Sequence, residues 1–588
     1  MIFDVLVQGG RVLDGMGAPA FPADVGVVAD EIVAVGRLDG AQAATVVDAS
    51  GRHVMPGLVD CHVHGDALAG DPAVQLAALR QGVTTFVLGQ DGLSFAPATT
   101  PGTLAYVTRY FAAVNGVHPW ADGPLSVREL LDGHDRTTAL NTAYLLPHGT
   151  IRYDVMGPAE RAATREELAA MLARVERGLE EGAAGLSTGL EYAPGRYADA
   201  AEIAALCAPL GGLPYVTHMR AYGERAAIGM AEVAAIARAS GAAGLSVHVS
   251  HYHGPASVLL PPLDAALDEG LDVTFDSYPY LRGSTILAMV ALPARIPAAD
   301  TERALEILAS EPVEWDESLW PRITLSHVPG AEWAEGMTLP EAAAKAGTGP
   351  GEFCRRILLD TRLSAGCVTA RPDEGPEGEE SVRAILRHPA HTGGSDGIYV
   401  GGHPHPRGYG AFARMLGHHV RETGDWSLAQ AAVHLASHPA RRFGLPRRGL
   451  VRPGQIADLA VVDAAAVRDL ATYESPASRP PAWTTSSSPA CRSWPRDGSP
   501  APPPGGRCGR ERLRSFPRVP ADPAPCLPGG PGGPGSASHA ASVSPVAPRT
   551  ARIGSAGPAA AGARGITRTL AAWRHRPPGL RGDEGSVR

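Results

Sequence analysis

Two histidines one residue apart are the first side chains in this sequence that could do chemistry together. They are His62 and His64, in the stretch GRHVMPGLVDCHVHGD that spans residues 51–66. The Pro-Gly turn and the short apolar run after it predict a strand. Because alternate side chains of a strand share a face, both imidazoles point the same way and can share a metal ion, whereas Cys61 faces the core.

Further candidate metal ligands lie at the ends of other predicted strands. Asp91 follows GVTTFVLGQ, His218 ends LPYVTH, His251 ends LSVHVSH, and Asp396 lies in HTGGSDG. In a TIM barrel the carboxyl ends of the strands converge on one mouth, where catalytic groups belong. Together with the first two histidines, these residues form a set of six nitrogen and oxygen ligands for an ion such as Zn²⁺.

The elements that must position these residues lie between about residues 55 and 440. Short buried strands alternate there with Ala-, Leu-, Arg- and Glu-rich helical stretches. This alternation predicts parallel βα units, and about eight of them predict an α/β fold with a (β/α)8 TIM-like barrel. The region 280–390 is too long for one βα step, so we expect an insertion there, such as a lid. The predicted strands are 58–64, 83–88, 142–146, 184–187, 215–218, 245–251, 272–276 and the segment ending at Asp396.

Strand patterns also mark both flanks of this region. Residues 1–54 alternate apolar and polar side chains between Gly, Asp and Pro, and GLVRPGQIADLAVVD repeats the pattern within 441–478. We therefore expect a small β-sandwich domain built from both chain ends. Residues 479–588 are rich in Pro, Gly, Ser, Ala and Arg without periodicity, which predicts a disordered tail.

The tail has a more specific interpretation. Lys345 is the only lysine among 52 basic residues, which is typical of a GC-rich gene. If AWTTSSSPACRSWPRDG is back-translated with such codons and shifted by one base, it reads approximately GVDDVVVAGVPVVAAG, a strand-like pattern. Our hypothesis is a frameshift between about Pro476 and Ala482; a natural disordered tail is the alternative. Resequencing the gene decides between them, and an intact frame through this region would exclude the frameshift.

Composition limits the possible partners. A net charge of −9 gives no reason to expect nucleic acid, and no run of eighteen apolar residues predicts a membrane span. The chain starts with strand-like sequence rather than a signal peptide, and its seven cysteines have no CxxC or framework spacing. We expect a cytoplasmic protein; the oligomeric state stays open.

Several motifs resemble one enzyme family in order and spacing. VMPGLVDCHVHGD is similar to the opening of the amidohydrolase superfamily. GLSTGLEYAPG, YVTHMR, DSYPYLRGSTIL, GGSDG, HPRGYGAF and RRGLVRPGQIADLAVVD resemble the D-aminoacylase (N-acyl-D-amino-acid deacylase) family over about residues 1–475. The set is specific, although each motif alone is weak.

The resemblance implies a metal site in which His62, His64 and Asp396 bind one position. His218 and His251 would bind a second one. The family commonly has a zinc-binding Cys where this chain has Asp91, and a hard oxygen in place of a soft thiolate admits Mn²⁺, Co²⁺ or Fe²⁺ besides Zn²⁺. The number of ions, one or two, stays open. Because no lysine lies near the site, a carboxylated lysine that bridges two metals is excluded.

The expected chemistry is hydrolysis of an amide. A bound divalent ion lowers the pKa of its water to about 7 and polarises the carbonyl group. Asp396 would be the catalytic acid and base, accepting the water proton and passing it to the departing amine.

The resemblance also implies contacts with a small N-acyl amino acid substrate. The family usually carries Lys two residues after the ligand histidine, but here that position is His253. Arg407 in HPRGYG matches a family arginine that contacts the substrate, and Arg282 could compensate for the missing lysine, since Arg binds carboxylates bidentately. The candidate substrate contacts are Arg407, Tyr280, His253, Arg282, Tyr192 and His148.

Three functions remain open at this point. The first is deacylation of N-acyl-D-amino acids, a linear amide. The second is hydrolysis of a cyclic amide, as in hydantoinases and dihydroorotases, against which the missing lysine argues. The third is a barrel that binds ligand without turnover, although all six candidate metal ligands are present.

Overall fold

The parallel strands that carry the candidate ligands form two neighbouring sheets. A computed structural model describes residues 2–119, 123–135, 137–240, 244–298, 300–478 and 484–486. One sheet has the order β10-β11-β12-β13-β14-β18, and the other β6-β8-β9. All neighbouring pairs in them are parallel. Their bounds are β6 Leu58–Asp60, β8 Val83–Leu88, β9 Asn141–Tyr144, β10 Leu146–Pro147, β11 Leu186–Gly189, β12 Tyr215–His218, β13 Ser246–Val249, β14 Asp272–Ser277 and β18 His391–Gly393.

Backbone hydrogen bonds join the two sheets at both edges. Ala184 N, two residues before β11, donates to Tyr144 O of β9 at 2.7 Å, and Cys61 N donates to Gly393 O at 3.2 Å. A short parallel pair, β7 (Val63–His64) with β19 (Gly397–Ile398), continues beyond β6 and β18. Each predicted strand of this region is confirmed, with ends that move by a few residues, and the strand expected over 58–64 is interrupted between β6 and β7.

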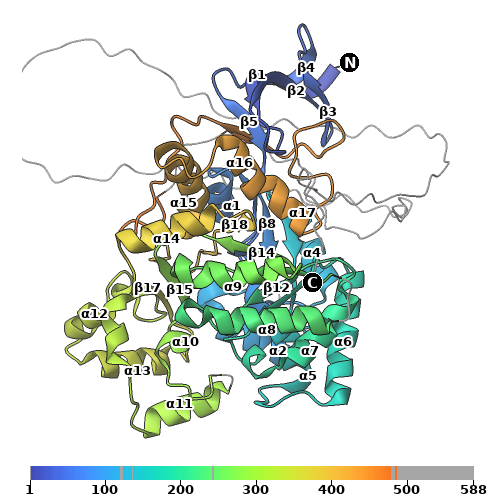
Figure 1. The fold of residues 1–588 in the computed structure, drawn as a ribbon. Helices are drawn as coiled ribbons and strands as arrows, with labels where there is room; N and C mark the ends of the chain where they lie inside the picture. Colours follow the sequence, from blue (N-terminus) through green and yellow to red (C-terminus); the bar gives the residue numbers. More distant parts are fainter. Residues whose placement is uncertain are drawn as a thin grey trace, which may run out of the picture. The chain divides into compact units, whose positions relative to one another are not determined.

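Helices alternate with these strands, as the sequence predicts. Helix α6 begins with a capping box in which Thr164 and Glu167 satisfy each other's backbone N–H groups. Helices α8 and α9 run side by side, and α9 lies against β14 (Figure 1). The helices outside region 280–370 are α1 Pro72–Leu79, α2 Pro101–Tyr110, α3 Ala112–Asn115, α4 Val127–His134, α5 His148–Met156, α6 Arg165–Glu180, α7 Ala200–Cys207, α8 Ala226–Ala239, α9 Ala256–Asp268, α14 Pro376–Leu386, α15 Arg407–Arg414, α16 Leu428–Ala432 and α17 His438–Arg442.

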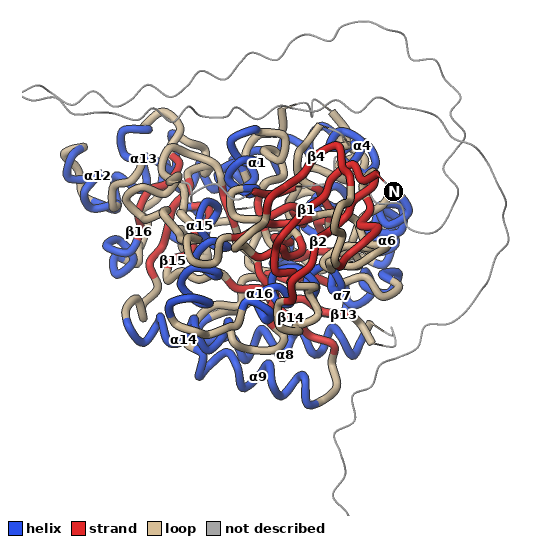
Figure 2. Tube along the Cα trace, turned by 90° about the horizontal axis from the view of Figure 1, so that it is seen from above, coloured by secondary structure: helices blue, strands red, loops and turns tan. Residues whose placement is uncertain are grey.

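A further sheet combines strands from both flanks of the chain. β20 (Leu459–Val462) pairs antiparallel with β5 (His53–Pro56), which lies beside β1. The sheet has its own apolar core, in which Val25, Ile32 and Val461 are buried. Figure 2 shows its strands β1, β2 and β4 together in front of the helices. The remaining bounds are β1 Ile2–Val12, β2 Phe21–Val28, β3 Glu31–Gly36, β4 Gln42–Asp48 and β21 Thr484–Ser486.

The long region 280–390 contains a separate antiparallel sheet of order β15-β17-β16. Its strands are β15 (Arg282–Ile286), β16 (Ile323–His327) and β17 (Gly366–Ala370). Helices α11, α12 and α13 lie together beyond this sheet (Figure 1). Besides α14, the helices of the region are α10 Leu287–Ala291, α11 Thr301–Ser310, α12 Leu339–Lys345 and α13 Pro350–Asp360.

At the C-terminal flank, two expectations are not confirmed. Within the segment 441–478 expected to complete the sandwich, residues 467–476 form neither helix nor strand. The predicted tail and the frameshift hypothesis fall outside the described residues, except that β21 pairs antiparallel with β20. Across the described residues, every helix is too short or too polar to cross a membrane.

Candidate metal centre

The six predicted ligands converge at the carboxyl ends of the parallel strands. Each lies at or just beyond the carboxyl end of a strand. Its side chain therefore reaches the edge of the sheet where these ends meet. All six side chains are buried, with at most 5% of each residue exposed. The residues are His62 and His64 around β7, Asp91 after β8, His218 at the end of β12, His251 after β13 and Asp396 after β18.

Asp91 lies at the middle of the cluster. Its Oδ2 is 3.6 Å from His64 Nε2, 3.5 Å from His218 Nδ1 and 3.6 Å from His251 Nε2. Its Oδ1 is 3.6 Å from His62 Nε2. One carboxylate therefore faces four imidazoles, as a group shared by two metal positions would.

Asp396, which follows β18, faces His62 and His64. Its Oδ1 lies 3.6 Å from His62 Nε2 and 3.3 Å from His64 Nε2. Its Oδ2 is paired with Arg407 Nη1 at 2.8 Å. Burial raises the pKa of this carboxyl group, but Arg407 and His62 outweigh burial and hold the pKa below its usual range. Asp396 is thus an ionised carboxylate that can accept a proton.

The donor set fits a divalent cation. Two ligands about 2.1 Å from one ion in tetrahedral geometry lie about 3.4 Å apart, close to the nitrogen–oxygen distances found here. Among the described residues, His62 Nε2 and Asp91 Oδ1 are buried without a hydrogen-bond partner. Burial lowers the pKa of His62, yet Asp276 and Asp396 raise it to about 10, so this point of the protein attracts positive charge.

Outer partners orient three of the imidazoles. Asn115 Oδ1 accepts from His64 Nδ1 at 3.0 Å, and Glu191 Oε2 accepts from His218 Nε2 at 2.8 Å. Asp276 Oδ2 accepts from His62 Nδ1 at 3.3 Å. In each of these rings the other nitrogen faces the cluster, and such partners commonly tune a metal site.

Asp276 also supports His251. Its Oδ1 accepts from the backbone N of His251 at 2.9 Å, while its Oδ2 accepts from His248 Nε2 at 3.0 Å. Sequence reasoning missed Asp276, Asn115 and Glu191. Asp276 does lie at a predicted strand end, like the ligands, and Glu191 lies in the motif GLSTGLEYAPG, but nothing in the sequence marks Asn115.

Backbone conformation at the centre is unusual. Asp91, His251 and Asp396 have positive φ values of 55°, 34° and 51°. Non-glycine residues rarely adopt this region, and such residues cluster at functional sites. The loop around Asp91 depends on its glycines, since a Cβ on Gly89 would lie 2.2 Å from Leu145 O.

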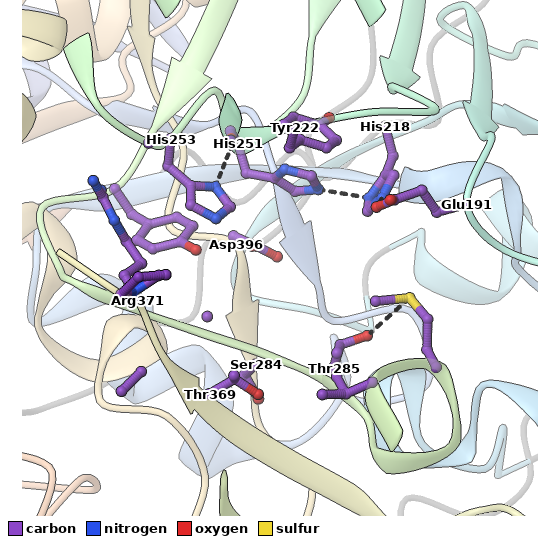
Figure 3. A pocket seen from close by; sticks show the side chains of 18 of the residues that line it. Glu191, His218, Tyr222, His251, His253, Ser284, Thr285, Thr369, Arg371 and Asp396 are labelled. Atoms are coloured by element: carbon purple, nitrogen blue, oxygen red, sulfur yellow. Dashed lines mark hydrogen bonds and ion pairs between the residues drawn. The ribbon is translucent and has the colours of Figure 1, made fainter. Parts of the chain in front are cut away.

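A cavity of about 630 Å³ opens beside the cluster. His64, Asp91, His218, His251 and Asp396 belong to its lining. Figure 3 shows the histidines along one side, Asp396 in the middle, and Ser284, Thr285 and Thr369 of the β15-β17-β16 sheet on the opposite side. The region expected as an insertion therefore supplies a wall of the pocket.

Comparison with known proteins agrees with this arrangement. A profile described as "Amidohydrolase family" matches residues 45–480, about three quarters of the chain. The chain belongs to the amidohydrolase family. This finding confirms the resemblance drawn from the motifs.

Relatives of this amidohydrolase include deacylases of Alcaligenes xylosoxydans xylosoxydans. It is 34% identical to an N-acyl-D-glutamate deacylase over 79% of its own chain and 88% of the relative. It is also 34% identical to a D-aminoacylase over 81% and 91%. Both matches place it in the D-aminoacylase family.

A solved structure gives the same family. An N-acyl-D-glutamate deacylase from Bordetella bronchiseptica, complexed with zinc and a phosphonate mimic of the tetrahedral intermediate, is 30% identical. The TM-score is 0.70, with 84% of this chain and 99% of that chain covered. A D-aminoacylase studied for its binuclear metal centre gives 0.69 at 32% identity, over 82% and 94%.

Only some of the predicted substrate contacts of this amidohydrolase line the cavity. Arg407, His253 and Tyr192 line the cavity, together with Tyr278, which the sequence analysis did not select. Arg407 is buried beside Tyr278, 4.6 Å from its ring centre, and its Nη2 donates to Ser284 O.

Three candidate contacts need correction because they do not line this cavity. Tyr280 turns away and donates its hydroxyl to Asp469 Oδ2 at 2.7 Å. Arg282 pairs with Glu374 at 2.7 Å, and His148 Nε2 is 2.8 Å from Glu202 Oε1. Both tyrosines lie between β14 and β15, outside regular structure, where strand alternation does not set the direction of a side chain, and Tyr278 rather than Tyr280 faces the pocket.

His253 faces the cavity as a neutral ring. Its Nδ1 donates to His251 O at 2.6 Å. Burial, and after it the neighbouring His251 and Arg371, lower its pKa to about 3. It therefore does not replace the charge of the family lysine.

Proposed function

We propose that this amidohydrolase removes the acyl group from N-acyl-D-amino acids and releases a carboxylate and a free D-amino acid. The observation that carries the proposal is the cluster of six buried nitrogen and oxygen ligands at the mouth of a cavity of substrate size. Its relatives that are deacylases of this kind match about four fifths of the chain.

The proposed cofactor is Zn²⁺, as one or two ions. His62, His64 and Asp396 would hold one position, and His218 and His251 the other, with Asp91 between them. When bound, a divalent ion supplies Lewis-acid activation of water and of the amide carbonyl. Because Asp91 offers oxygen where a thiolate would select zinc, Mn²⁺, Co²⁺ or Fe²⁺ can also serve.

Asp396 is the proposed acid and base. Its ion pair with Arg407 keeps it ionised, with Oδ1 directed at the ligand cluster. It takes the proton from the attacking water and passes it to the amine nitrogen as the carbon–nitrogen bond breaks. Transfer of this kind typically accelerates a reaction by roughly 10²–10⁴-fold.

The architecture that we infer around this centre is a closed (β/α)8 barrel with a β-sandwich from both flanks. Hydrogen bonds at both edges of the two parallel sheets support closure. The proposed domain limits are 55–440 for the barrel and 1–54 with 441–478 for the sandwich. A cytoplasmic location is supported by four buried free cysteines among the described residues.

The two other functions are less well supported. In the carboxylated-lysine centre of cyclic-amide hydrolases a lysine lies between the metals, whereas Lys345 lies on α12 with its ammonium 5.0 Å from the ring centre of Trp333. A barrel without turnover would not need to keep six ligands, a proton acceptor and their outer partners in place.

The test uses metal-stripped protein reconstituted with Zn²⁺, Mn²⁺ or Co²⁺ and a panel of N-acetyl-D- and N-acetyl-L-amino acids. We expect metal-dependent release of the D-amino acids. Bound metal without turnover of either enantiomer would refute the proposed substrate class. Preferential release of L-amino acids would refute the stereochemistry.

A further inference from the structure

We propose that Arg371 binds a carboxylate group of the substrate, a proposal that rests on the proposed function. Arg371 directly follows β17, in the region expected as an insertion. It lines the cavity that also contains Asp396 and His253. Figure 3 shows it on the His253 side of the pocket, with Asp396 between it and His218.

The position of Arg371 is fixed by its backbone and by one carboxylate. Its backbone N donates to Leu281 O at 3.1 Å, which ties it to the start of β15. Asp373 Oδ1 accepts from its Nε at 2.8 Å, and Asp373 Oδ2 accepts from its Nη2. This two-point contact sets the plane of the guanidinium group, and only 9% of the residue is exposed.

The remaining nitrogen of that guanidinium has no partner. Among the described residues, Arg371 Nη1 is buried without any hydrogen bond. A buried donor left unpaired is costly, and native proteins keep few of them without a functional reason. A carboxylate entering the cavity would satisfy Nη1 with a charge-assisted hydrogen bond.

The other charged residues of the cavity are less suited to this task. Of the three arginines in its lining, Arg407 is paired through Nη1 with Asp396 and through Nη2 with Ser284 O, which leaves its inner Nε without a partner among the described residues. Arg322 donates its Nε to Ala370 O. Two acidic residues that could repel a substrate carboxylate, Glu224 and Glu377, are exposed, where water and salt screen them. A third, Glu191, is paired with His218.

The experiment compares substrates with and without a carboxylate. Wild type, Arg371→Gln and Arg371→Lys are assayed with N-acetyl-D-leucine, N-acetyl-D-glutamate and the uncharged N-acetyl-D-leucinamide. Arg295→Gln is the matched control, since Arg295 pairs with Glu311 in the same region and is absent from the cavity lining. Melting temperature and metal content of each variant exclude loss of fold or of the metal centre.

We expect Arg371→Gln to lower kcat/KM for N-acetyl-D-leucine by about tenfold to a hundredfold, mainly through KM, with partial recovery in Arg371→Lys. The uncharged leucinamide should be affected by less than about twofold, and Arg295→Gln should match wild type. If only the glutamate substrate is affected, Arg371 binds the side-chain carboxylate instead of the α-carboxylate. Equal losses for charged and uncharged substrates, or no loss, would overturn the proposal.

The inference and the proposed function can fail separately. Absence of D-amino acid release by wild type would refute the function alone. Calorimetric binding of N-acetyl-D-leucine and N-acetyl-D-glutamate then decides the role of Arg371. Binding to wild type that Arg371→Gln weakens for either ligand supports it. Binding that the substitution leaves unchanged for both, or no binding of either to wild type, overturns it.

Discussion

At the scale of single residues, Asp91 and Asp396 set the chemistry of the centre. Both carboxylates face the same imidazoles, but their surroundings differ. The ion-pair partners of Asp91 are histidines, and His218 and His251 outweigh the effect of burial and hold the pKa of Asp91 well below the usual range. Asp396 is paired with Arg407 in addition to its two histidine neighbours. We therefore assign a ligand role to the first and proton transfer to the second.

The first prediction concerns metal selectivity. Asp91→Cys should raise the affinity for Zn²⁺ relative to Mn²⁺, because a thiolate is a soft ligand. The positive φ of 55° will cost the Cys variant some stability, of the order of 1 kcal/mol. Competition titrations with a chelator measure both affinities. Asp91→Asn is the control, which should weaken both metals; an unchanged ratio in Asp91→Cys would contradict the assignment.

The second prediction concerns proton transfer. Asp396→Asn should lower kcat by roughly 10²–10⁴-fold, because an amide cannot accept and return the proton. Asn tolerates the positive φ of 51° at this position, so the fold should persist. Stopped assays together with metal analysis distinguish lost transfer from lost metal. Activity within a few-fold of wild type in the metal-loaded variant would exclude Asp396 as the acid and base.

At the scale of elements, short strands and tight loops place the ligands. The loop after β8 passes so close to its neighbours that side chains do not fit. A Cβ on Gly92 would lie 2.6 Å from Gly189 N, and the φ of Gly92 is +69°. Asp91 is held between Gly89 and Gly92, so the loop geometry decides where the carboxylate lies.

The third prediction follows from that loop. Gly92→Ala should displace Asp91, weaken metal binding at least tenfold and lower the melting temperature by several degrees. Gly102→Ala is the control, because the nearest atom to its added Cβ is a side-chain oxygen 3.7 Å away, near the start of α2. Metal titration and thermal unfolding test the pair. Equal behaviour of the two variants would show that the loop has room to adjust.

At the scale of the whole molecule, buried neutral histidines make the fold sensitive to acid. Burial lowers the pKa of His134 to about 4, and only 6% of the residue is exposed. In the unfolded chain the pKa is about 6.5, so below that pH the unfolded state binds a proton that the native state does not. The contribution of the neutral, buried His134 to the free energy of unfolding is complete above pH 6.5 and is lost as the pH falls toward 4.

The fourth prediction measures this loss. Between pH 7 and 4.5 the free energy of unfolding of wild type should fall by up to about 3 kcal/mol more than that of His134→Gln. Urea unfolding at both values gives the difference, and effects of the metal centre cancel because both proteins contain it. Parallel pH dependence of the two proteins would contradict the assignment.

The sequence by itself determined the parallel strands and the six candidate ligands at their ends. Strand periodicity is local, and the barrel rule places strand ends together, so residues as distant along the chain as His62 and Asp396 could be assigned to one site from their positions alone. The family followed from motifs in order, and the comparisons confirm it.

Only the tertiary structure decided what surrounds those ligands. Asp276 and His62 are 214 positions apart, and no local pattern predicts their hydrogen bond. The same holds for Tyr278 in place of Tyr280 in the cavity and for the unpaired nitrogen of Arg371. Which side of an irregular segment faces a pocket depends on packing against distant residues, and that packing is a property of the folded chain rather than of any stretch of its sequence.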